Sequence, residues 1–320
     1  MTVRIGIIGT GGIAEVALAP AVGKARGAQL WSVLSRDAER GHAFAARHGA
    51  RAPSPVSTDI EAFLADPRLD AVIIASPDRL HASQAILAAK AGKHVLCEKP
   101  MATSPDEARA MTAAARAAGV RLGVAFHLRW HAGHRIVAAQ AREGALGELR
   151  HARVQWTYRA PDASNWRARN DVGRWWALAA TGPHCVDLAR WMLSPSCGEV
   201  TELRAVVSRH AFRGPHDETA VLAMRFASGA TAEIVVSVLF DSTPMVEIFG
   251  TAGSATCEGT LGRHGAGRVR LRGAEVPFAV QDPFEAEVAD FVRAIEEGRD
   301  PEVNGEEGVR NTELLAEAAP

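Results

Sequence analysis

The fold of this chain is decided near its start, by the stretch Val3-Arg4-Ile5-Gly6-Ile7-Ile8-Gly9-Thr10-Gly11-Gly12-Ile13-Ala14. An apolar run up to Ile8 is followed by a glycine turn and then by residues that can be helical. Gly9 permits a tight turn, Gly11 lets the backbone approach a pyrophosphate, and Ala14 keeps a helix close to the strand. The N–H groups at the helix start would face the phosphates. The stretch therefore predicts the strand, turn and helix of a dinucleotide-binding βαβ unit.

A second short motif, Glu98-Lys99-Pro100, follows another apolar run, His94–Cys97. Open α/β sheets bind ligands at the carboxyl ends of their strands, so the motif places an amine where a cofactor would lie. Such an amine can orient a substrate hydroxyl and lower its pKa, and Glu98 would hold the lysine in place or contact a nicotinamide ribose. The alternative is that Lys99 is an exposed charge at a strand end. The position favours redox chemistry on an oxygen-bearing carbon.

The order of predicted strands and helices changes once along the chain. Up to about residue 123, strands and helices alternate, which indicates a parallel sheet with helices on both faces. After residue 145, longer strands joined by short turns indicate a mostly antiparallel sheet. The expected strands are Val3–Ile8, Gln29–Leu34, Ala71–Ala75, His94–Cys97 and Leu122–Ala125, then Arg153–Ala160, Val200–His210, Thr219–Phe226, Ala230–Leu239 and Met245–Phe249.

We therefore predict an α/β chain with a Rossmann-type parallel sheet in a dinucleotide-binding domain over residues 1–124. An α+β domain with a large, mostly antiparallel open sheet should follow over residues 125–320. Two helices are expected in it, Trp175–Leu193 and Phe284–Glu297. Helix starts in the first domain are indicated at Thr58-Asp59-Ile60-Glu61, a capping-box pattern, and at Ser104-Pro105-Asp106-Glu107.

Composition excludes several classes of protein. The 320 residues allow two domains, and 47% hydrophobic and 23% charged residues are ordinary for a soluble protein. Lys plus Arg, 36, balance Asp plus Glu, 37, so no overall field favours nucleic acid or an anionic membrane. The chain enters a strand at once and has no apolar run near the roughly 18 residues of a spanning helix, so neither a signal peptide nor a membrane segment is expected. The scattered cysteines indicate reduced thiols in a cytoplasmic protein: Cys97, Cys185, Cys197 and Cys257.

The end of the second expected strand, Leu34-Ser35-Arg36-Asp37, bears on the choice of nucleotide. An acidic residue that grips the ribose hydroxyls is expected at about this point of an NAD-binding domain. Here the first positions are Ser35 and Arg36, and a guanidinium binds phosphate through a planar fork. We therefore expect NADP, with NAD possible. The alternative is that Arg36 is a solvated surface residue and that Asp37 contacts the ribose.

Five segments spread over nearly the whole chain resemble the Gfo/Idh/MocA family of sugar and polyol oxidoreductases. They read GTGGIA at 9–14, IASPDRLH at 74–81, AGKHVLCEKP at 91–100, GVAFHLR at 123–129 and GPHCVD at 182–187. Residues 126–135 are also similar to the 1,5-anhydro-D-fructose reductases within that family. The resemblance implies that the open sheet of the second domain serves substrate binding and subunit contact, and that the Lys99–Pro100 peptide bond is cis. It also implies cofactor contacts from Gly9, Thr10, Gly11, Gly12, Ile13, Ser76, Pro77, His81, Glu98 and Lys99.

His184 lies in an otherwise apolar helical stretch, where a lone histidine is more often a satisfied core residue. The family resemblance implies proton transfer with the substrate instead. Asp187 follows one helical turn later and either contacts the substrate or merely shares the helix surface. The family usually carries an aspartate four residues before this histidine, whereas this chain has Ala180, which removes a carboxylate that would orient the imidazole.

The chain departs from the family again at Arg174-Trp175-Trp176, where a glycine triplet is common, and this indicates a reshaped pocket. Trp166 lies in a polar loop and is the best candidate for stacking on a sugar ring.

A histidine-rich crossover, His127 to His134, joins the two predicted domains. His127 and Arg129 are expected to line the substrate cleft. His131 and His134 have the spacing of metal ligands, but no carboxylate or cysteine completes a site, so no metal is expected.

These observations predict an oxidoreductase, preferring NADP, that transfers a hydride between C4 of the nicotinamide and a sugar, polyol or related carbonyl compound. Lys99 would polarise the substrate oxygen and His184 would exchange the proton. The competing class is a non-catalytic protein that binds nucleotide and sugar to control a partner, and another enzyme option is NAD-dependent dihydrodiol or aldose dehydrogenation. We expect a homodimer or homotetramer formed through the open sheet face, where Val235, Leu239 and Phe240 would supply apolar surface.

Overall fold

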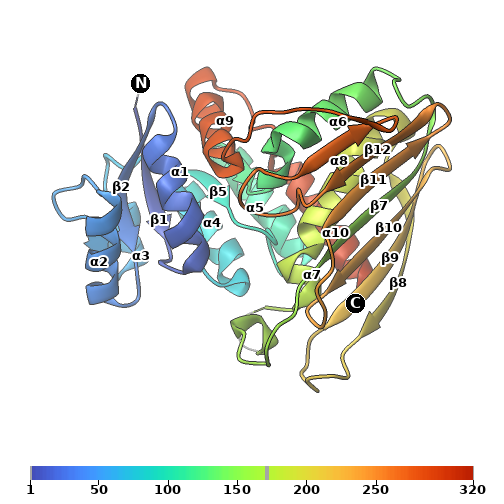
Figure 1. Cartoon of the computed structure of the whole chain (residues 1–320). Helices are drawn as coiled ribbons and strands as arrows, with labels where there is room; N and C mark the ends of the chain where they lie inside the picture. Colours follow the sequence, from blue (N-terminus) through green and yellow to red (C-terminus); the bar gives the residue numbers. More distant parts are fainter. Residues whose placement is uncertain (1, 170–172, 320) are drawn as a thin grey trace. The chain divides into compact units, whose positions relative to one another are not determined.

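The structure, a computed structural model, describes residues 2–169 and 173–319 and divides into two compact units (Figure 1). The first unit comprises the residues up to Phe126 together with Phe284–Thr312, and the second comprises His127–Pro283 together with the residues from Glu313 onward. The sequence predicts one domain over residues 125–320, whereas Phe284–Thr312 belongs to the first unit. This segment contains all of α9 (Pro283–Glu297) except Pro283, and the first half of α10 (Gly305–Ala318). The reason is apolar burial, because Phe284 and Phe291 lie in the same core cluster as the first strand.

The first unit is built on a six-stranded sheet in the order β3-β2-β1-β4-β5-β6, with every neighbouring pair parallel. This confirms the predicted Rossmann-type sheet. Ile73 and Ile74, adjacent in β4, are both fully buried and belong to different core clusters, so apolar residues cover both faces of the sheet. The strands are β1 (Val3–Ile8), β2 (Ala28–Leu34), β3 (Val56–Ser57), β4 (Ala71–Ile74), β5 (His94–Cys97) and β6 (Leu122–Val124).

The helices of the first unit start where polar side chains can cap them. Ser104 accepts a hydrogen bond from the backbone N–H of Glu107 at 3.2 Å, as the sequence predicts. The predicted cap at Thr58 is wrong by one residue, because the carboxylate of Asp59 accepts from the N–H of Ala62 at 2.8 Å and becomes the N-cap. The helices are η1 (Ala14–Leu18, a π-helical turn), α1 (Ala19–Lys24), α2 (Ala38–His48), α3 (Ile60–Leu64), η2 (Asp78–Leu80), α4 (His81–Lys90) and α5 (Pro105–Ala118).

The second unit contains an eight-stranded sheet in the order β14-β13-β12-β11-β7-β10-β9-β8. β7 and β10 are parallel, and the other neighbouring pairs are antiparallel, so the predicted open, mostly antiparallel sheet is confirmed. The strands are β7 (Leu149–Thr157), β8 (Val200–Ser208), β9 (Thr219–Phe226), β10 (Thr231–Ser237), β11 (Met245–Gly250), β12 (Gly253–Glu258), β13 (Arg268–Leu271) and β14 (Ala274–Glu275).

The helices of the second unit are η3 (His127–Trp130), α6 (Ala132–Arg142), η4 (Trp166–Ala168), α7 (Ala177–Ala180) and α8 (Gly182–Cys197). The sequence predicts one helix over Trp175–Leu193, and the structure corrects this to α7 and α8. Asp217 starts α7, since its carboxylate accepts from the backbone N–H groups of Trp176 at 2.8 Å and Leu178 at 2.6 Å. Pro183 suits the first turn of a helix but not its interior, so a new helix begins after Thr181.

One face of the second sheet is buried and the other is open, as the alternating burial along β9 shows. Of the residues predicted to supply apolar surface, Val235 is half-buried and is the register partner of Val221, and Phe240 is 44% exposed. Within Ile234–Phe240, alternate residues turn to the core, and Ile234, Val236 and Val238 are fully buried. Outside lie Val206 and Val221, which are cross-strand partners and are 75% and 43% exposed. Further along the same sheet, the Arg153 side chain on β7 pairs with Glu233 on β10 and Glu247 on β11.

Across the described ranges 2–169 and 173–319, no helix combines the length and the apolar character needed to cross a membrane.

Candidate nucleotide and substrate sites

The glycine turn has the shape that a pyrophosphate needs. Gly9 has a φ of +100°, and a Cβ at this position would lie 2.8 Å from the carbonyl oxygen of Ala75, so only glycine fits. A Cβ at Gly11 or Gly12 would meet no atom of the described residues within 4 Å, which leaves this backbone open to a ligand. Ala14 is fully buried at the start of the helix. The turn therefore fits a dinucleotide whose phosphates lie on a helix N-terminus.

At the end of β2, two arginines and a buried hydroxyl lie next to this turn. Ser35 is 3% exposed, and its Oγ is 3.4 Å from Oγ1 of Thr10. Arg36 is exposed. Asp37 caps α2, because its carboxylate accepts from the backbone N–H of Arg40 at 3.0 Å. Nε of Arg40 in turn donates to Oγ1 of Thr10 at 2.9 Å, which fixes a second guanidinium at the glycine turn.

Arg40 was not predicted from the sequence. It lies in the first turn of α2, three residues after the cap Asp37, and its contact with Thr10 depends on the tertiary fold. Ile13, which the sequence predicts as a cofactor contact, is half-buried at the start of η1.

The loop after β4 carries three further predicted cofactor residues. Oγ of Ser76 donates to Oε1 of Gln84 at 2.6 Å, and Pro77 is half-buried. His81 is fully buried, with Nδ1 2.9 Å from the carbonyl oxygen of Pro100 and Nε2 2.9 Å from that of Ser76. Since both ring nitrogens face backbone carbonyls, the geometry gives His81 a role in holding the two loops. A direct cofactor contact of His81 stays a prediction.

Lys99 lies two residues beyond β5, is half-buried, and has a cis peptide bond to Pro100, as the resemblance implies. The carboxylate of Glu98, 6% exposed, accepts a hydrogen bond from the backbone N–H of Lys99 at 3.1 Å. Burial, together with the charges of Glu98 and Asp78, raises the pKa of the Cys97 thiol well above its ordinary value. Cys97 is thus a protonated packing residue behind Lys99.

The strand register brings these features of the first unit to one edge. Ile8 is the register partner of Ile74, and Ile74 is the partner of Cys97, so β1, β4 and β5 end level with one another. The glycine turn, the Ser76 loop and Lys99 follow these three strand ends directly. In a parallel sheet this is the edge where ligands bind.

In the second unit, His184 lies on α8 and is 2% exposed. Its ring contacts that of His127 edge-on, with centroids 4.7 Å apart, and that of Trp156, with centroids 5.6 Å apart. Nε2 of His127 is 3.2 Å from the carbonyl oxygen of Gly262. Ala180, which stands where the family usually has a carboxylate, is half-buried at the end of α7. His184 thus contacts two aromatic rings.

Arg129 and Asp187, both predicted substrate contacts, form an ion pair. Nη2 of Arg129 is 2.6 Å from Oδ1 of Asp187, and Nε is 2.9 Å from Oδ2. The side chains are 4% and 1% exposed. The pair joins η3, which carries His127, to α8, which carries His184. Direct substrate contact by Arg129 and Asp187 stays a prediction.

His131 and His134 are structural residues. Nε2 of His134 is 2.7 Å from Oγ1 of Thr260 and Nδ1 is 2.9 Å from the carbonyl oxygen of Leu128. Burial lowers the pKa of His134 to about 3 and also lowers the pKa of His131. Among the described residues, no group of three or more His, Cys, Asp or Glu side chains is arranged to hold a metal ion.

The tryptophans singled out in the sequence differ in exposure. Trp166 is half-buried, and the guanidinium of Arg167 lies 4.1 Å from the centre of its indole. Stacking of a sugar on Trp166 stays a prediction. Trp175 and Trp176 are each 2% exposed. All four cysteines are buried and unbridged.

Family models match both parts of the chain. The model described as "Oxidoreductase family, NAD-binding Rossmann fold" covers residues 3–126, and the "GFO/IDH/MocA C-terminal domain" covers residues 134–256. The chain belongs to the Gfo/Idh/MocA family of oxidoreductases. Membership of this family favours an enzyme over a non-catalytic regulator.

Individual relatives are similar over nearly the whole chain. A 1,5-anhydro-D-fructose reductase from Ensifer adhaerens is 33% identical, over 96% of this chain and 92% of its own length. A D-xylose 1-dehydrogenase (NADP(+)) from Haloferax volcanii is 32% identical, over 98% of this chain and 96% of its own length. The crystal structure of aldose-aldose oxidoreductase from Caulobacter crescentus complexed with glycerol superposes with a TM-score of 0.91 at 25% identity, covering 100% of this chain and 98% of that one.

Proposed function

We propose that this protein is an NADP-preferring oxidoreductase that transfers a hydride between nicotinamide and a sugar, polyol or related carbonyl compound. The observation that carries the proposal is the common edge of β1, β4 and β5, where the open glycine turn and Lys99 follow strands that end in register. The glycine turn would hold the phosphates of a dinucleotide, and Lys99 follows a strand end at the same edge. The named activities of the sugar-processing relatives support the substrate class.

The side chains supply binding and proton handling. When bound, the nicotinamide accepts or donates the hydride. During oxidation of an alcohol, the ammonium of Lys99 hydrogen-bonds the substrate oxygen and lowers the pKa of its hydroxyl, while the imidazole of His184 takes the proton. During reduction, the same proton returns from His184 to the oxygen. Glu98 holds the backbone of Lys99, and the Arg129–Asp187 pair holds the helix that carries His184.

The preference for NADP rests on the end of β2. Arg36 is exposed there, and Arg40 is fixed to Thr10 of the glycine turn. Two guanidinium groups suit a 2′-phosphate, which accepts paired hydrogen bonds from arginine. Asp37, the residue that would select NAD, uses its carboxylate to cap α2. The alternative in which Asp37 grips the ribose is therefore less well supported.

We further propose that the protein is a homodimer or homotetramer joined through the open face of the second sheet. Val206 and Val221 form an exposed apolar pair there, which water disfavours. The group of Arg153, Glu233 and Glu247 further along the same sheet offers both signs of charge to a second copy.

Turnover with a panel of compounds tests the activity. NADPH oxidation and NADP reduction should be followed by absorbance with aldoses, ketoses, polyols and dihydrodiols, with the Lys99→Ala variant as control. Turnover of at least one class that depends on Lys99 supports the proposal. Nucleotide and sugar binding without any turnover would favour the regulatory alternative.

A further inference from the structure

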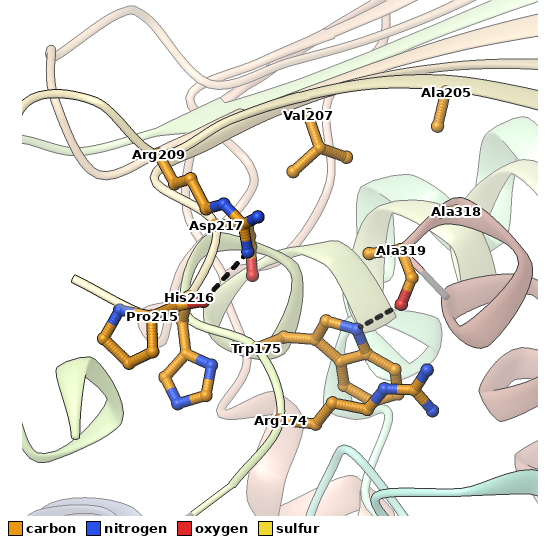
Figure 2. A pocket seen from close by; sticks show the side chains of 10 residues that line it. All are labelled: Arg174, Trp175, Ala205, Val207, Arg209, Pro215, His216, Asp217, Ala318 and Ala319. Atoms are coloured by element: carbon orange, nitrogen blue, oxygen red, sulfur yellow. Dashed lines mark hydrogen bonds between the residues drawn. The ribbon is translucent and has the colours of Figure 1, made fainter. Parts of the chain in front are cut away.

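The segment that begins with Arg174 and Trp175, which the proposed reaction does not use, lines a pocket of about 390 Å³ in the second unit (Figure 2). The opposite wall is strand β8 and its continuation, with Val207 and Arg209. The end of α10 and the residues around Asp217 complete the lining. This volume lies in the range of small-molecule sites, roughly 300–1,000 Å³.

The middle of the pocket is apolar. Figure 2 shows the side chains of Ala205 and Val207 on one wall and the indole of Trp175 on the wall facing them. Nε1 of Trp175 donates to the carbonyl oxygen of Ala319 at 3.3 Å, which fixes the indole in the pocket wall. An apolar segment of a ligand can therefore pack between Val207 and Trp175.

The two ends of the pocket carry positive charge. Figure 2 shows the guanidinium groups of Arg209 and Arg174 on different sides of the pocket. Nη1 of Arg209 donates a long hydrogen bond, 3.5 Å, to the carbonyl oxygen of Pro215. The guanidinium of Arg174 lies 5.1 Å from the ring centre of Trp175. Within residues 2–169 and 173–319, neither arginine forms an ion pair with a carboxylate.

The other polar groups of the lining are already engaged. The carboxylate of Asp217 accepts from the backbone N–H groups of Trp176 and Leu178 at 2.8 and 2.6 Å. Nε2 of His216 is 3.1 Å from the carbonyl oxygen of Arg169. The arginines are thus the groups in the pocket best placed to recognise a ligand, and arginine binds carboxylate and phosphate groups through paired hydrogen bonds.

We propose that this pocket binds a small organic dianion, with two oxyanion groups separated by an apolar segment. One oxyanion pairs with Arg209, the other pairs with Arg174, and the apolar segment lies between Val207 and Trp175. The inference rests on the pocket alone and stands independently of the proposed oxidoreductase activity.

Calorimetric titration of the full-length protein tests the proposal. The probes are terephthalate and the linear dicarboxylates from succinate to suberate, with benzoate as the single-charge reference. The titrations are made in saturating NADP, which occupies the nucleotide site proposed for the first unit and so keeps the probes from binding there. The best dianion should bind about tenfold or more tightly than benzoate, because a second charge-assisted contact contributes about that factor.

Two variants assign the charges. Arg174→Gln and Arg209→Gln should each reduce the affinity for the dianion to that for benzoate. Arg270→Gln is the matched control, because Arg270 is exposed on β13 near the other edge of the same sheet and should leave binding unchanged. Arg209 is exposed, so its variant tests the proposal even if Arg174→Gln lowers the stability of the protein.

A third variant tests the location. Val207→Trp fills the pocket without removing charge and should abolish binding of both dianion and benzoate. The proposal is overturned if no dianion binds saturably, if neither arginine variant weakens binding, or if dianion binding survives Val207→Trp.

Discussion

Arg129 and Asp187 form a doubly hydrogen-bonded ion pair whose side chains are 4% and 1% exposed. Arg129 follows His127 by two residues in η3, and Asp187 follows His184 by three residues in α8. A charge pair this deeply buried is tolerated only when its geometry satisfies both partners. Here the guanidinium offers two nitrogens to the two carboxylate oxygens. The pair thereby ties η3 to α8 beside the edge-on contact between His127 and His184.

Breaking this pair should destabilise the protein strongly. Asp187→Asn leaves the Arg129 cation buried opposite a neutral amide, a change that typically costs about 3–5 kcal/mol. Urea unfolding should show a drop of this size in the free energy of unfolding. Asp106→Asn is the control, because Asp106 pairs with Arg109 while 96% exposed and should change little. A free energy of unfolding for Asp187→Asn equal to that of the control would show that the pair contributes no more than a surface contact.

The buried His134 should make stability depend on pH. Its pKa in the folded protein is about 3, below the ordinary value of about 6.5 that the unfolded chain restores. Between these values the unfolded state binds a proton that the folded state does not, so stability is full above pH 6.5 and falls as the pH is lowered. Linkage gives a loss of about 2 kcal/mol between pH 7 and pH 5 from this group.

The His134→Gln variant isolates that contribution. A glutamine offers an amide to Thr260 but takes up no proton, so the drop in the free energy of unfolding between pH 7 and pH 5 should shrink by about 2 kcal/mol. Chemical unfolding at both pH values measures it. An unchanged drop in the variant would mean that other groups cause the acid sensitivity.

Much of the fold could be predicted because its signals are local. The run Val3–Ile8, the glycine turn and the strand ending at Cys97 are read directly from apolar periodicity and turn chemistry. β12, β13 and β14 were missed: β13 and β14 are short, and each of the three strands pairs with the one before it, so their conformation depends on the sheet that β11 begins. The return of α9 to the first unit depends on long-range packing of Phe284 and Phe291, which no local pattern shows.

Some residues of the candidate site could likewise be predicted from the sequence, and others could not. Lys99 and Gly9 follow strand ends, so their common edge was predictable from the sequence. The pairing of Arg129 with Asp187 joins residues 58 positions apart, and the capping of α7 by Asp217 joins residues 39 and 41 positions apart. Such contacts depend on the tertiary fold. The hydrogen bond from Arg40 to Thr10, 30 positions apart, depends on it in the same way.

Assembly through the open sheet face should be sensitive to charge at Val221. This residue is 43% exposed opposite Val206, and Val221→Glu would place a carboxylate in the centre of the proposed contact. The variant should shift the mass measured by light scattering from an oligomer to a monomer at micromolar concentration. Val280→Glu, at a 65% exposed valine outside the sheet, should leave the mass unchanged. A monomeric wild type would overturn the proposed assembly.

Nucleotide selectivity should depend on both arginines beside the glycine turn. Arg36→Ala and Arg40→Ala each remove a charge-assisted contact to a 2′-phosphate, so each should raise the Kd for NADPH by about ten- to hundredfold. The Kd for NADH, which lacks that phosphate, should barely change. Arg47→Ala is the control, because Arg47 lies at the other end of α2 and pairs with Glu15. Fluorescence titration measures the affinities, and equal weakening of both nucleotides in the Arg36 and Arg40 variants would reject the assignment.

Catalysis should depend more on Lys99 than on His184. Lys99 follows a strand end that is in register with the end of β1, which places this residue at the edge of the sheet where a cofactor is expected to bind. His184 contacts two aromatic rings and has Ala180 where a carboxylate would orient the imidazole, so its general acid–base contribution should fall near the low end of the usual range of about 10²–10⁴-fold. Steady-state kinetics should therefore show a larger loss of kcat for Lys99→Ala than for His184→Ala, whereas Ala180→Asp should be tolerated or mildly activating.

Arg79→Ala is the control for the loss of a nearby positive charge, because Arg79 is exposed in η2, which follows the neighbouring strand β4. Near-normal turnover in Lys99→Ala would remove the mechanism, because no other amine among the described residues follows β1, β4 or β5 at that edge.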